Sequence, residues 1–345
     1  MIHGSLAPVE SVSWQSLLSR SITDPEQLLR RLALDPALLA GARAGAADFP
    51  LRVPEPFVER MQKGDPNDPL LRQVLPLGEE LLEHPDYVLD PLGEQHTNTR
   101  AGIIHKYHGR LLLIVSGGCA VNCRYCFRRH FPYGDNNLST EQWQQALDYI
   151  RGDQSIGEVI YSGGDPLAAS DKRLAWLTRE IAAIPHVRRL RVHTRLPVVI
   201  PQRVTSELID ALCGTRLPVV MVLHSNHANE FDAALGNAVL RLRQAGITLL
   251  NQTVLLRGVN DSLETLISLS ETLGDHGILP YYLHVLDHVK GAQHFHVDDG
   301  AAMGLAAGMR ARLPGFLVPR LVREVAGETS KTPLPFQTAG THRLA

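Results

Sequence analysis

Short apolar runs alternate with amphipathic segments along the chain from about residue 110 onward. Runs of this length are typical of strands, whereas the segments between them repeat apolar residues at helical spacing. Each connection is long enough for a helical crossover, so we expect the strands to be parallel. The predicted strands cover residues 111–115, 158–162, 190–193, 219–224, 248–255 and 281–285. The predicted helices between them cover residues 139–150, 171–184, 205–213, 229–244 and 262–273.

The first hundred residues show a different pattern, in which helical periodicity over residues 14–19 and 25–34 is followed by scattered prolines. We therefore predict an α/β protein with a helical N-terminal segment (1–100), a partial parallel (β/α)6 barrel (101–315) and a C-terminal segment (316–345). In barrels of this kind the functional groups gather at the C-terminal ends of the strands. Cys119, Asp165, His224 and Asp287 all lie at or shortly after the end of a predicted strand.

Composition narrows the class of protein. The chain is 44% hydrophobic and 20% charged, which is typical of a soluble globular protein. Its 34 basic and 36 acidic residues give a net charge of −2, and this balance argues against direct nucleic-acid binding or attachment to an anionic membrane. There is no apolar run long enough for a transmembrane helix and no secretory signal pattern at the N-terminus. We expect a cytoplasmic protein.

The cysteines indicate a metal site. Three of the four lie in one C-x3-C-x2-C segment as Cys119, Cys123 and Cys126, whereas Cys213 falls on a predicted helix and is interpreted as an inert thiol. Three thiolates on one loop can hold three corners of an iron–sulfur cubane and leave one iron open. The alternative is a Cys3His zinc site completed by a residue such as His130. The spacing favours iron–sulfur, because zinc sites more often use paired C-x2-C arms.

The cysteine segment follows the first strand of the βα series and carries an aromatic residue just before its last cysteine, and in this it resembles the radical S-adenosylmethionine (SAM) superfamily. The resemblance implies a barrel of the radical SAM type, a [4Fe-4S] cluster on the three cysteines, and SAM on the open iron. The Ser-Gly-Gly-Asp-Pro-Leu run from Ser162 is similar to the glycine motif of that superfamily, so Gly163, Gly164 and Asp165 are implied cofactor contacts. A Gly-Gly pair after a strand is, by itself, more often only a turn.

Further segments resemble the lysine 2,3-aminomutases within that superfamily, and together they span about residues 100–335. Two more runs, His-Lys-Tyr-His from His105 and Gly-Asp-Pro-Asn-Asp-Pro from Gly64, resemble a short bacterial branch of the family that supplies β-lysine for modifying elongation factor P. The segments that carry the family resemblance are Cys-Phe-Arg-Arg-His from Cys126, Thr-Arg-Leu-Pro-Val-Val from Thr194, Asn-Gln-Thr-Val-Leu-Leu from Asn251, Tyr-Tyr-Leu-His from Tyr281 and Ser-Lys-Thr-Pro from Ser330.

The family resemblance also implies pyridoxal phosphate, which these enzymes carry on a lysine near the C-terminus, here Lys331. A lysine near a chain end is usually only solvated, but lysine is scarce in this chain and the Ser-Lys-Thr-Pro run matches. Arg110 matches a further contact to pyridoxal phosphate, and His224 and Gln252 match positions near SAM.

The resemblance assigns the substrate to three more residues. Arg128 matches the arginine that pairs with the substrate carboxylate, a task suited to a bidentate donor. Asp287 and Glu324 match two acids around the distal amine of lysine, although lysine enzymes of the family usually carry aspartate at the position of Glu324. Two acids aimed at one point favour a cationic side chain over that of glutamate.

These inferences predict an isomerase that converts L-α-lysine to β-lysine by a radical 1,2-amino shift, with electrons from a flavodoxin- or ferredoxin-type reductant. Two alternatives stay open: an aminomutase that makes a free β-amino acid for metabolism, and a non-catalytic zinc-binding module. Four histidines near the last predicted strand invite a second metal site, but their mixed spacing favours solvated or supporting side chains. They are His284, His288, His294 and His296.

Overall fold

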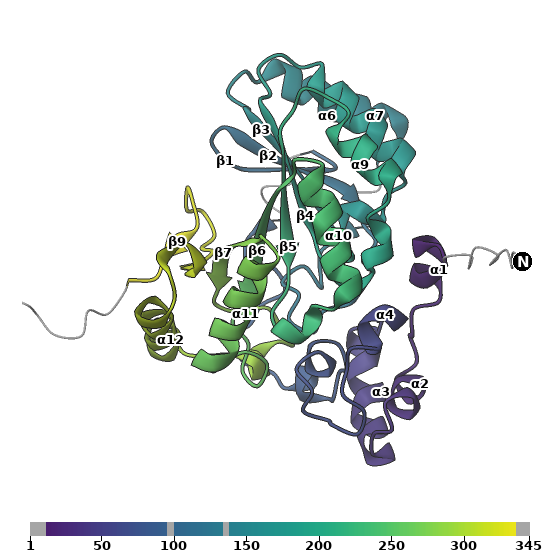
Figure 1. Ribbon diagram of the computed structural model, residues 1–345, viewed down its shortest axis with the longest axis vertical. Helices are drawn as coiled ribbons and strands as arrows, with labels where there is room; N and C mark the ends of the chain where they lie inside the picture. Colours follow the sequence, from purple (N-terminus) through teal and green to yellow (C-terminus); the bar gives the residue numbers. More distant parts are fainter. Residues whose placement is uncertain (1–11, 95–99, 134–137, 336–345) are drawn as a thin grey trace, which may run out of the picture.

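The computed structural model describes residues 12–94, 100–133 and 138–335. Its centre is a nine-stranded sheet in which the strands follow one another in chain order (Figure 1). Strands β2 to β8 are parallel, and one antiparallel strand closes each end of the sheet. The strands are β1 (Ile103–Tyr107), β2 (Arg110–Ser116), β3 (Glu158–Gly163), β4 (Arg189–Thr194), β5 (Val219–His224), β6 (Thr248–Val254), β7 (Leu279–His284), β8 (Arg320–Arg323) and β9 (Thr332–Pro333).

Helices cover the outer face of the curved sheet (Figure 1). Each of the longer ones follows a strand and returns the chain to the start of the next, as the parallel order requires. The longer helices are α6 (Thr140–Gly152), α7 (Asp171–Ala182), α9 (Ser206–Cys213), α10 (Ala233–Gln244), α11 (Leu263–Asp275) and α12 (Asp299–Arg312). The short helix α8 (Leu196–Val199) precedes α9 in the connection from β4 to β5.

The predicted mixed α/β fold with a mostly parallel sheet is confirmed, and every predicted strand and helix is present. Among the barrel elements, the sequence pattern missed β1, β8, β9, the four-residue helix α8 and α12. The first three are short strands at the two ends of the sheet. Helix α12 is rich in alanine and glycine, so it has no continuous apolar stripe to detect. Strand β8 begins after residue 315 and pairs with β7 in the same sheet, and the boundaries at residues 100 and 315 stay predictions.

In strand β4, alternate side chains point to opposite faces of the sheet, so one face of the strand is apolar and the other is polar. In β4, Leu190 and Val192 are fully buried in the core against the helices. Arg189, Arg191 and His193 alternate with them and line a cavity on the opposite side. The other parallel strands bring both kinds of side chain to the cavity: in β3, Glu158 and Ser162 line it together with Ile160. The charged and polar groups on the concave side therefore come from alternate positions along the strands.

The N-terminal segment is helical, as predicted, and packs against the barrel. It consists of α1 (Trp14–Ser19), α2 (Pro25–Arg31), α3 (Leu39–Asp48), α4 (Glu55–Val58) and short 3-10 turns. Its backbone reaches the loop that carries the three cysteines: the amides of Asn122 and Arg124 donate to the carbonyls of Arg52 (3.0 Å) and Gln73 (2.9 Å). Within the described residues, no helix is long and apolar enough to cross a membrane.

Candidate active site

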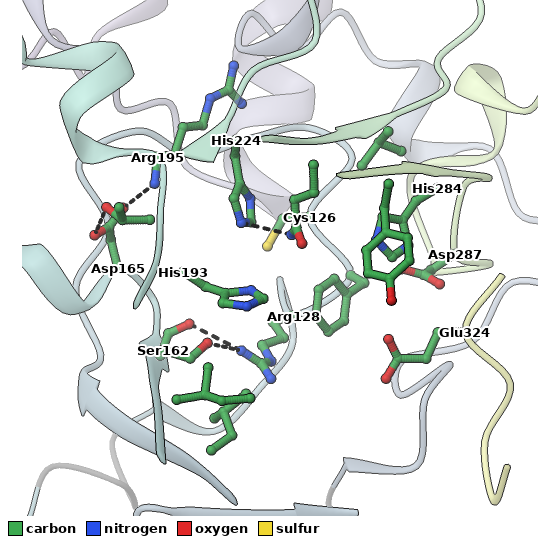
Figure 2. Close-up of a pocket in the computed structure, with 18 of the residues that line it drawn as sticks. Cys126, Arg128, Ser162, Asp165, His193, Arg195, His224, His284, Asp287 and Glu324 are labelled. Atoms are coloured by element: carbon green, nitrogen blue, oxygen red, sulfur yellow. Dashed lines mark hydrogen bonds between the residues drawn. The ribbon is translucent and has the colours of Figure 1, made fainter. Parts of the chain in front are cut away.

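A cavity of about 770 Å³ opens on the concave face of the sheet. Figure 2 shows side chains from several strands and loops converging on it. Every residue that the family resemblance assigns to the site lines this one space, although these residues are scattered over more than two hundred positions. They are Arg110, Cys119, Cys123, Cys126, Arg128, Gly163, Gly164, Asp165, His224, Gln252, Asp287, Glu324 and Lys331.

The cysteine loop follows β2 and presents three thiols to the cavity. Burial and the neighbouring cysteine raise the pKa of Cys126 to about 12, and burial likewise raises the pKa of Cys119. Thiolates in such a setting need a cation close by, and iron supplies one on coordination. Gly164 leaves space beside the loop, since a Cβ there would lie 2.9 Å from Cys119 Sγ and 2.7 Å from the Gly118 carbonyl. The donor set and its cradle fit an iron–sulfur cluster.

The side chains of the described residues form no ready site for a single metal ion, and this applies to the three cysteines as well as to the histidines. Across residues 12–94, 100–133 and 138–335, no three histidine, cysteine, aspartate or glutamate side chains are grouped to hold a single metal ion. The same finding covers the four histidines near β7. His130 is half-buried, and burial together with Arg129 lowers its pKa.

The Gly-Gly-Asp turn after β3 is held by its own aspartate. The Asp165 carboxylate accepts hydrogen bonds from Thr194 Oγ1 (2.7 Å) and from the amides of Arg195 (2.8 Å), Leu196 (2.9 Å) and Leu167 (3.0 Å). Both oxygens of the Asp165 carboxylate therefore accept hydrogen bonds from other groups of the protein. The carboxylate ties the end of β3 to the end of β4 and so fixes the backbone of Gly163 and Gly164.

His224 and Gln252, both assigned to SAM by resemblance, contact each other. The Gln252 amide nitrogen lies 2.8 Å from His224 Nε2. Burial lowers the pKa of His224 to about 3, so the ring is neutral at physiological pH. An amide nitrogen can only donate, so Nε2 is the acceptor and the ring proton sits on Nδ1.

Arg128 is paired with a buried carboxylate that the sequence analysis did not identify. Its Nε and Nη2 donate to Glu94 Oε2 and Oε1 at 2.6 and 2.9 Å, a two-bond ion pair. Its Nη1 donates to Ser162 Oγ at 3.0 Å (Figure 2). Glu94 also pairs with Lys106 at 3.2 Å. Nothing in the sequence pattern marks Glu94, because it follows a Pro-Leu-Gly run outside any strand.

Asp287 and Glu324 lie on the same side of the cavity (Figure 2). Glu324 forms an ion pair with Lys331, accepts a hydrogen bond from Tyr107 Oη at 3.0 Å, and lies 3.6 Å from Lys106 Nζ. Burial alone would raise the pKa of Glu324, but Lys331 and Lys106 hold it at about 2. Burial and the charge of Glu324 raise the pKa of Asp287 to about 7.

Four arginines line the part of the cavity beside the starts of the strands: Arg110, Arg189, Arg191 and Arg320. One carboxylate, Glu158, pairs with Arg191 (2.7 Å) and Arg189 (3.4 Å). The Nε atom of Arg191 is buried and has no hydrogen-bond partner among the described residues. This wall carries an excess of positive charge, which suits a phosphate group.

Two further histidines of the cavity, His193 and His284, lie at the C-terminal ends of predicted strands, where barrel chemistry gathers. The Nε2 atom of each is buried and lacks a hydrogen-bond partner in the described part of the chain. His284 is one of the four histidines near the last predicted strand, and the sequence gives neither ring a specific role.

The chain is similar to several known proteins. Residues 113–269 match the family model of the Radical SAM superfamily. The chain is 51% identical to L-lysine 2,3-aminomutase of Escherichia coli (strain K12) over 94% of this chain and 95% of that protein. It is 50% identical to the Haemophilus influenzae protein of the same name over 94% and 96%. Its identity to L-lysine 2,3-aminomutase of Clostridium subterminale is 33%, over 93% of this chain and 77% of that protein.

Proposed function

The chain belongs to the L-lysine 2,3-aminomutase family of the radical SAM superfamily, and from this premise we propose that it converts L-α-lysine to β-lysine by a 1,2-amino shift. One observation carries the proposal. A single cavity holds a three-thiol loop, an arginine for a carboxylate, two acids for an ammonium group, and a lysine beside a basic wall.

Two groups of charged side chains in the cavity match the two charged ends of free lysine. Arg128 offers the substrate carboxylate the N–H groups that Glu94 and Ser162 leave unused. Asp287 and Glu324 offer negative charge to the distal ammonium group. Ion pairing at both ends selects a molecule with a carboxylate and a cationic side chain, and the walls between them keep water from the reacting carbons.

The residues present also fit three cofactors. Cys119, Cys123 and Cys126 would hold the [4Fe-4S] cluster, and the backbone at Gly163 and Gly164, with His224 and Gln252, would contact SAM. Lys331 would carry pyridoxal phosphate, and Arg110 with the basic wall would hold its phosphate. When bound, the cluster and SAM supply a carbon-centred radical, and pyridoxal phosphate supplies a π system that accepts the migrating nitrogen.

Lys331 and Glu324 are coupled in this proposal. In the ligand-free protein the ammonium group of Lys331 neutralises Glu324. If Lys331 carried pyridoxal phosphate, its nitrogen would no longer be a free ammonium group, and the Glu324 carboxylate would be available to the cation of the substrate.

Chain length supports the finer part of the proposal, a role in supplying β-lysine for elongation factor P. The chain covers nearly all of its E. coli and H. influenzae relatives but about three quarters of the clostridial one. The match over nearly the full length of these two relatives supports grouping it with them. A flavodoxin- or ferredoxin-type protein would deliver the electron. Intact-mass analysis of elongation factor P from cells lacking this chain tests the link, since the β-lysyl mass should be absent.

The activity itself is tested by incubating the anaerobically reconstituted protein with SAM, pyridoxal phosphate, dithionite and L-lysine. We expect β-lysine by mass spectrometry, lost in Cys126→Ala and in Lys331→Ala. Matched controls are Cys213→Ala and Lys172→Ala, which change residues outside the cavity lining and should keep the product. 5′-Deoxyadenosine without β-lysine would retain the radical chemistry but reject lysine as substrate. Neither product from a protein with a verified cluster would contradict the whole proposal.

A further inference from the structure

A buried arginine contacts one of the cluster cysteines. Arg195 follows β4, is 6% exposed, and donates from Nη1 to Cys123 Sγ at 2.8 Å. Arg195 therefore places a positive charge next to the sulfur of Cys123 in the cysteine loop. Arg195 is not among the residues proposed to hold the cluster, SAM, pyridoxal phosphate or lysine.

The guanidinium is held in place from several directions. Its Nη2 donates to Gln73 Oε1 at 2.7 Å and to Glu230 Oε2 at 3.2 Å. Its backbone amide is fixed by Asp165. A guanidinium group is not deprotonated in proteins, so Arg195 keeps its positive charge under all working conditions. The N–H donor cannot leave the sulfur without breaking the other bonds of this network.

We propose that Arg195 tunes the reduction potential of the cluster held by the three cysteines. In the one-electron step, an external donor loses an electron and the cluster gains it, while Arg195 keeps its proton throughout. The reduced cluster carries one more negative charge on iron and sulfur than the oxidised cluster. A charge-assisted N–H···S bond is stronger to the more negative state, so Arg195 stabilises the reduced form and raises the potential.

The effect is large enough to measure. A hydrogen bond to a charged group changes an equilibrium constant by about an order of magnitude or more. Loss of this bond should therefore lower the equilibrium constant for cluster reduction about tenfold, which is 59 mV for a one-electron couple. Arg195 is a positioning and tuning residue in this view, because it acts through Cys123.

The test is a redox titration monitored by electron paramagnetic resonance on the full chain, reconstituted with iron and sulfide and studied without SAM or lysine. We expect Arg195→Gln to shift the midpoint potential downward by about this amount, and Arg195→Lys to shift it less because the charge stays. The control is Arg203→Lys, which removes another buried guanidinium. Arg203 donates to the carbonyls of Leu167 and Ala169 and pairs with Asp171, so its loss should leave the potential unchanged.

The iron content and the melting temperature of each variant are also measured, because they distinguish a change in potential from a failure to fold or to bind the cluster. If Arg195→Gln fails to fold or to take up iron, Arg195→Lys carries the measurement. Equal midpoint potentials in wild type and in an Arg195 variant with full iron content would overturn the proposal, and so would an upward shift. Loss of the cluster from both variants would make Arg195 an assembly residue and overturn it too. The measurement uses no substrate, so its outcome is separate from whether the chain makes β-lysine.

Discussion

Arg128 and Glu94 form a two-bond ion pair inside the cavity, with Nε–Oε2 and Nη2–Oε1 distances of 2.6 and 2.9 Å. Of the five N–H groups of the guanidinium, this pair uses two on one edge. Nη1 donates to Ser162 Oγ at 3.0 Å and lies 3.5 Å from the Gly163 carbonyl oxygen, so only part of the guanidinium is left for a further partner. An acid near an arginine can compete with a bound carboxylate, but here it fixes the orientation of the arginine.

Glu94→Gln should therefore weaken lysine binding. The amide keeps the shape of the side chain but has one acceptor oxygen, so one of the two bonds is lost and Arg128 is left partly unpaired. We expect KM for lysine to rise about tenfold or more, with a smaller change in kcat. Initial rates of β-lysine formation measure both. Glu83→Gln, at an exposed acid, is the control. An unchanged or lower KM in Glu94→Gln would show that Glu94 does not position Arg128.

The pKa of Asp287 predicts a pH dependence. At about 7 it is well above the usual range of an aspartate, so in the free enzyme Asp287 is neutral below that pH and charged above it. The ε-ammonium group of lysine, with a pKa near 10.4, stays charged throughout, and it binds the charged acid. We expect kcat/KM to rise as the pH increases toward about 7 and then to level off. Asp287→Asn should remove this step and keep kcat/KM low at every pH, whereas Asp86→Asn, at an exposed acid, should leave the profile as it is.

Gly164 should be irreplaceable in the cluster cradle. An alanine Cβ would lie 2.7 Å from the carbonyl oxygens of Gly117 and Gly118 and 2.9 Å from Cys119 Sγ, closer than such atoms approach. We expect Gly164→Ala to lose most of its bound iron after reconstitution, as measured by iron and sulfide analysis. Gly304→Ala is the matched control, because its Cβ meets no atom within 4 Å and it lies within α12. Full iron content in Gly164→Ala would mean that the cysteine loop can move away from the turn.

The N-terminal segment should stabilise the cysteine loop through Arg124. Both Arg124 and its partner Glu80 are buried, with 1% of each side chain exposed. Burial alone would raise the pKa of Glu80, but Arg124 holds it below its ordinary value. Because Arg124 would keep only the half-exposed Glu79, at 3.1 Å, as a charged partner, Glu80→Gln should lower the free energy of unfolding by about 3 kcal/mol in urea denaturation. Glu26→Gln, which breaks the exposed pair with Arg43, should cost less than about 1 kcal/mol. Equal effects of the two changes would refute this role of Arg124.

The sequence predicts the parts of this molecule that are local. The strands were found because apolar runs of the right length recur, and the metal loop was found because its three cysteines are close in the chain. The Glu94–Arg128 pair and the Arg195–Cys123 contact could not be found in this way. Their partners are 34 and 72 residues apart, and only the packing of the barrel brings them together.

Asp165 shows a different limit. Its place in a family motif marks it as a cofactor contact, but the motif does not say where the carboxylate points. In the structure its oxygens are taken up by the ends of β3 and β4. The sequence also gives the N-terminal segment no function. Its contacts to the cysteine loop combine backbone carbonyls, which any residue type provides, with side-chain pairs such as Arg124–Glu80 whose members lie far apart in the chain.

The alternation of polar and apolar residues along β4 restricts how a gene for this fold can change in length. Deleting one codon within Arg189–Thr194 would turn the residues before the gap to the opposite face of the sheet relative to those after it. Arginines would then face the helices and leucine or valine would face the cavity, so packing and chemistry would be damaged by the same event. Insertions and deletions should therefore accumulate in the connections away from the cavity, while strand lengths stay constant among proteins that retain this chemistry.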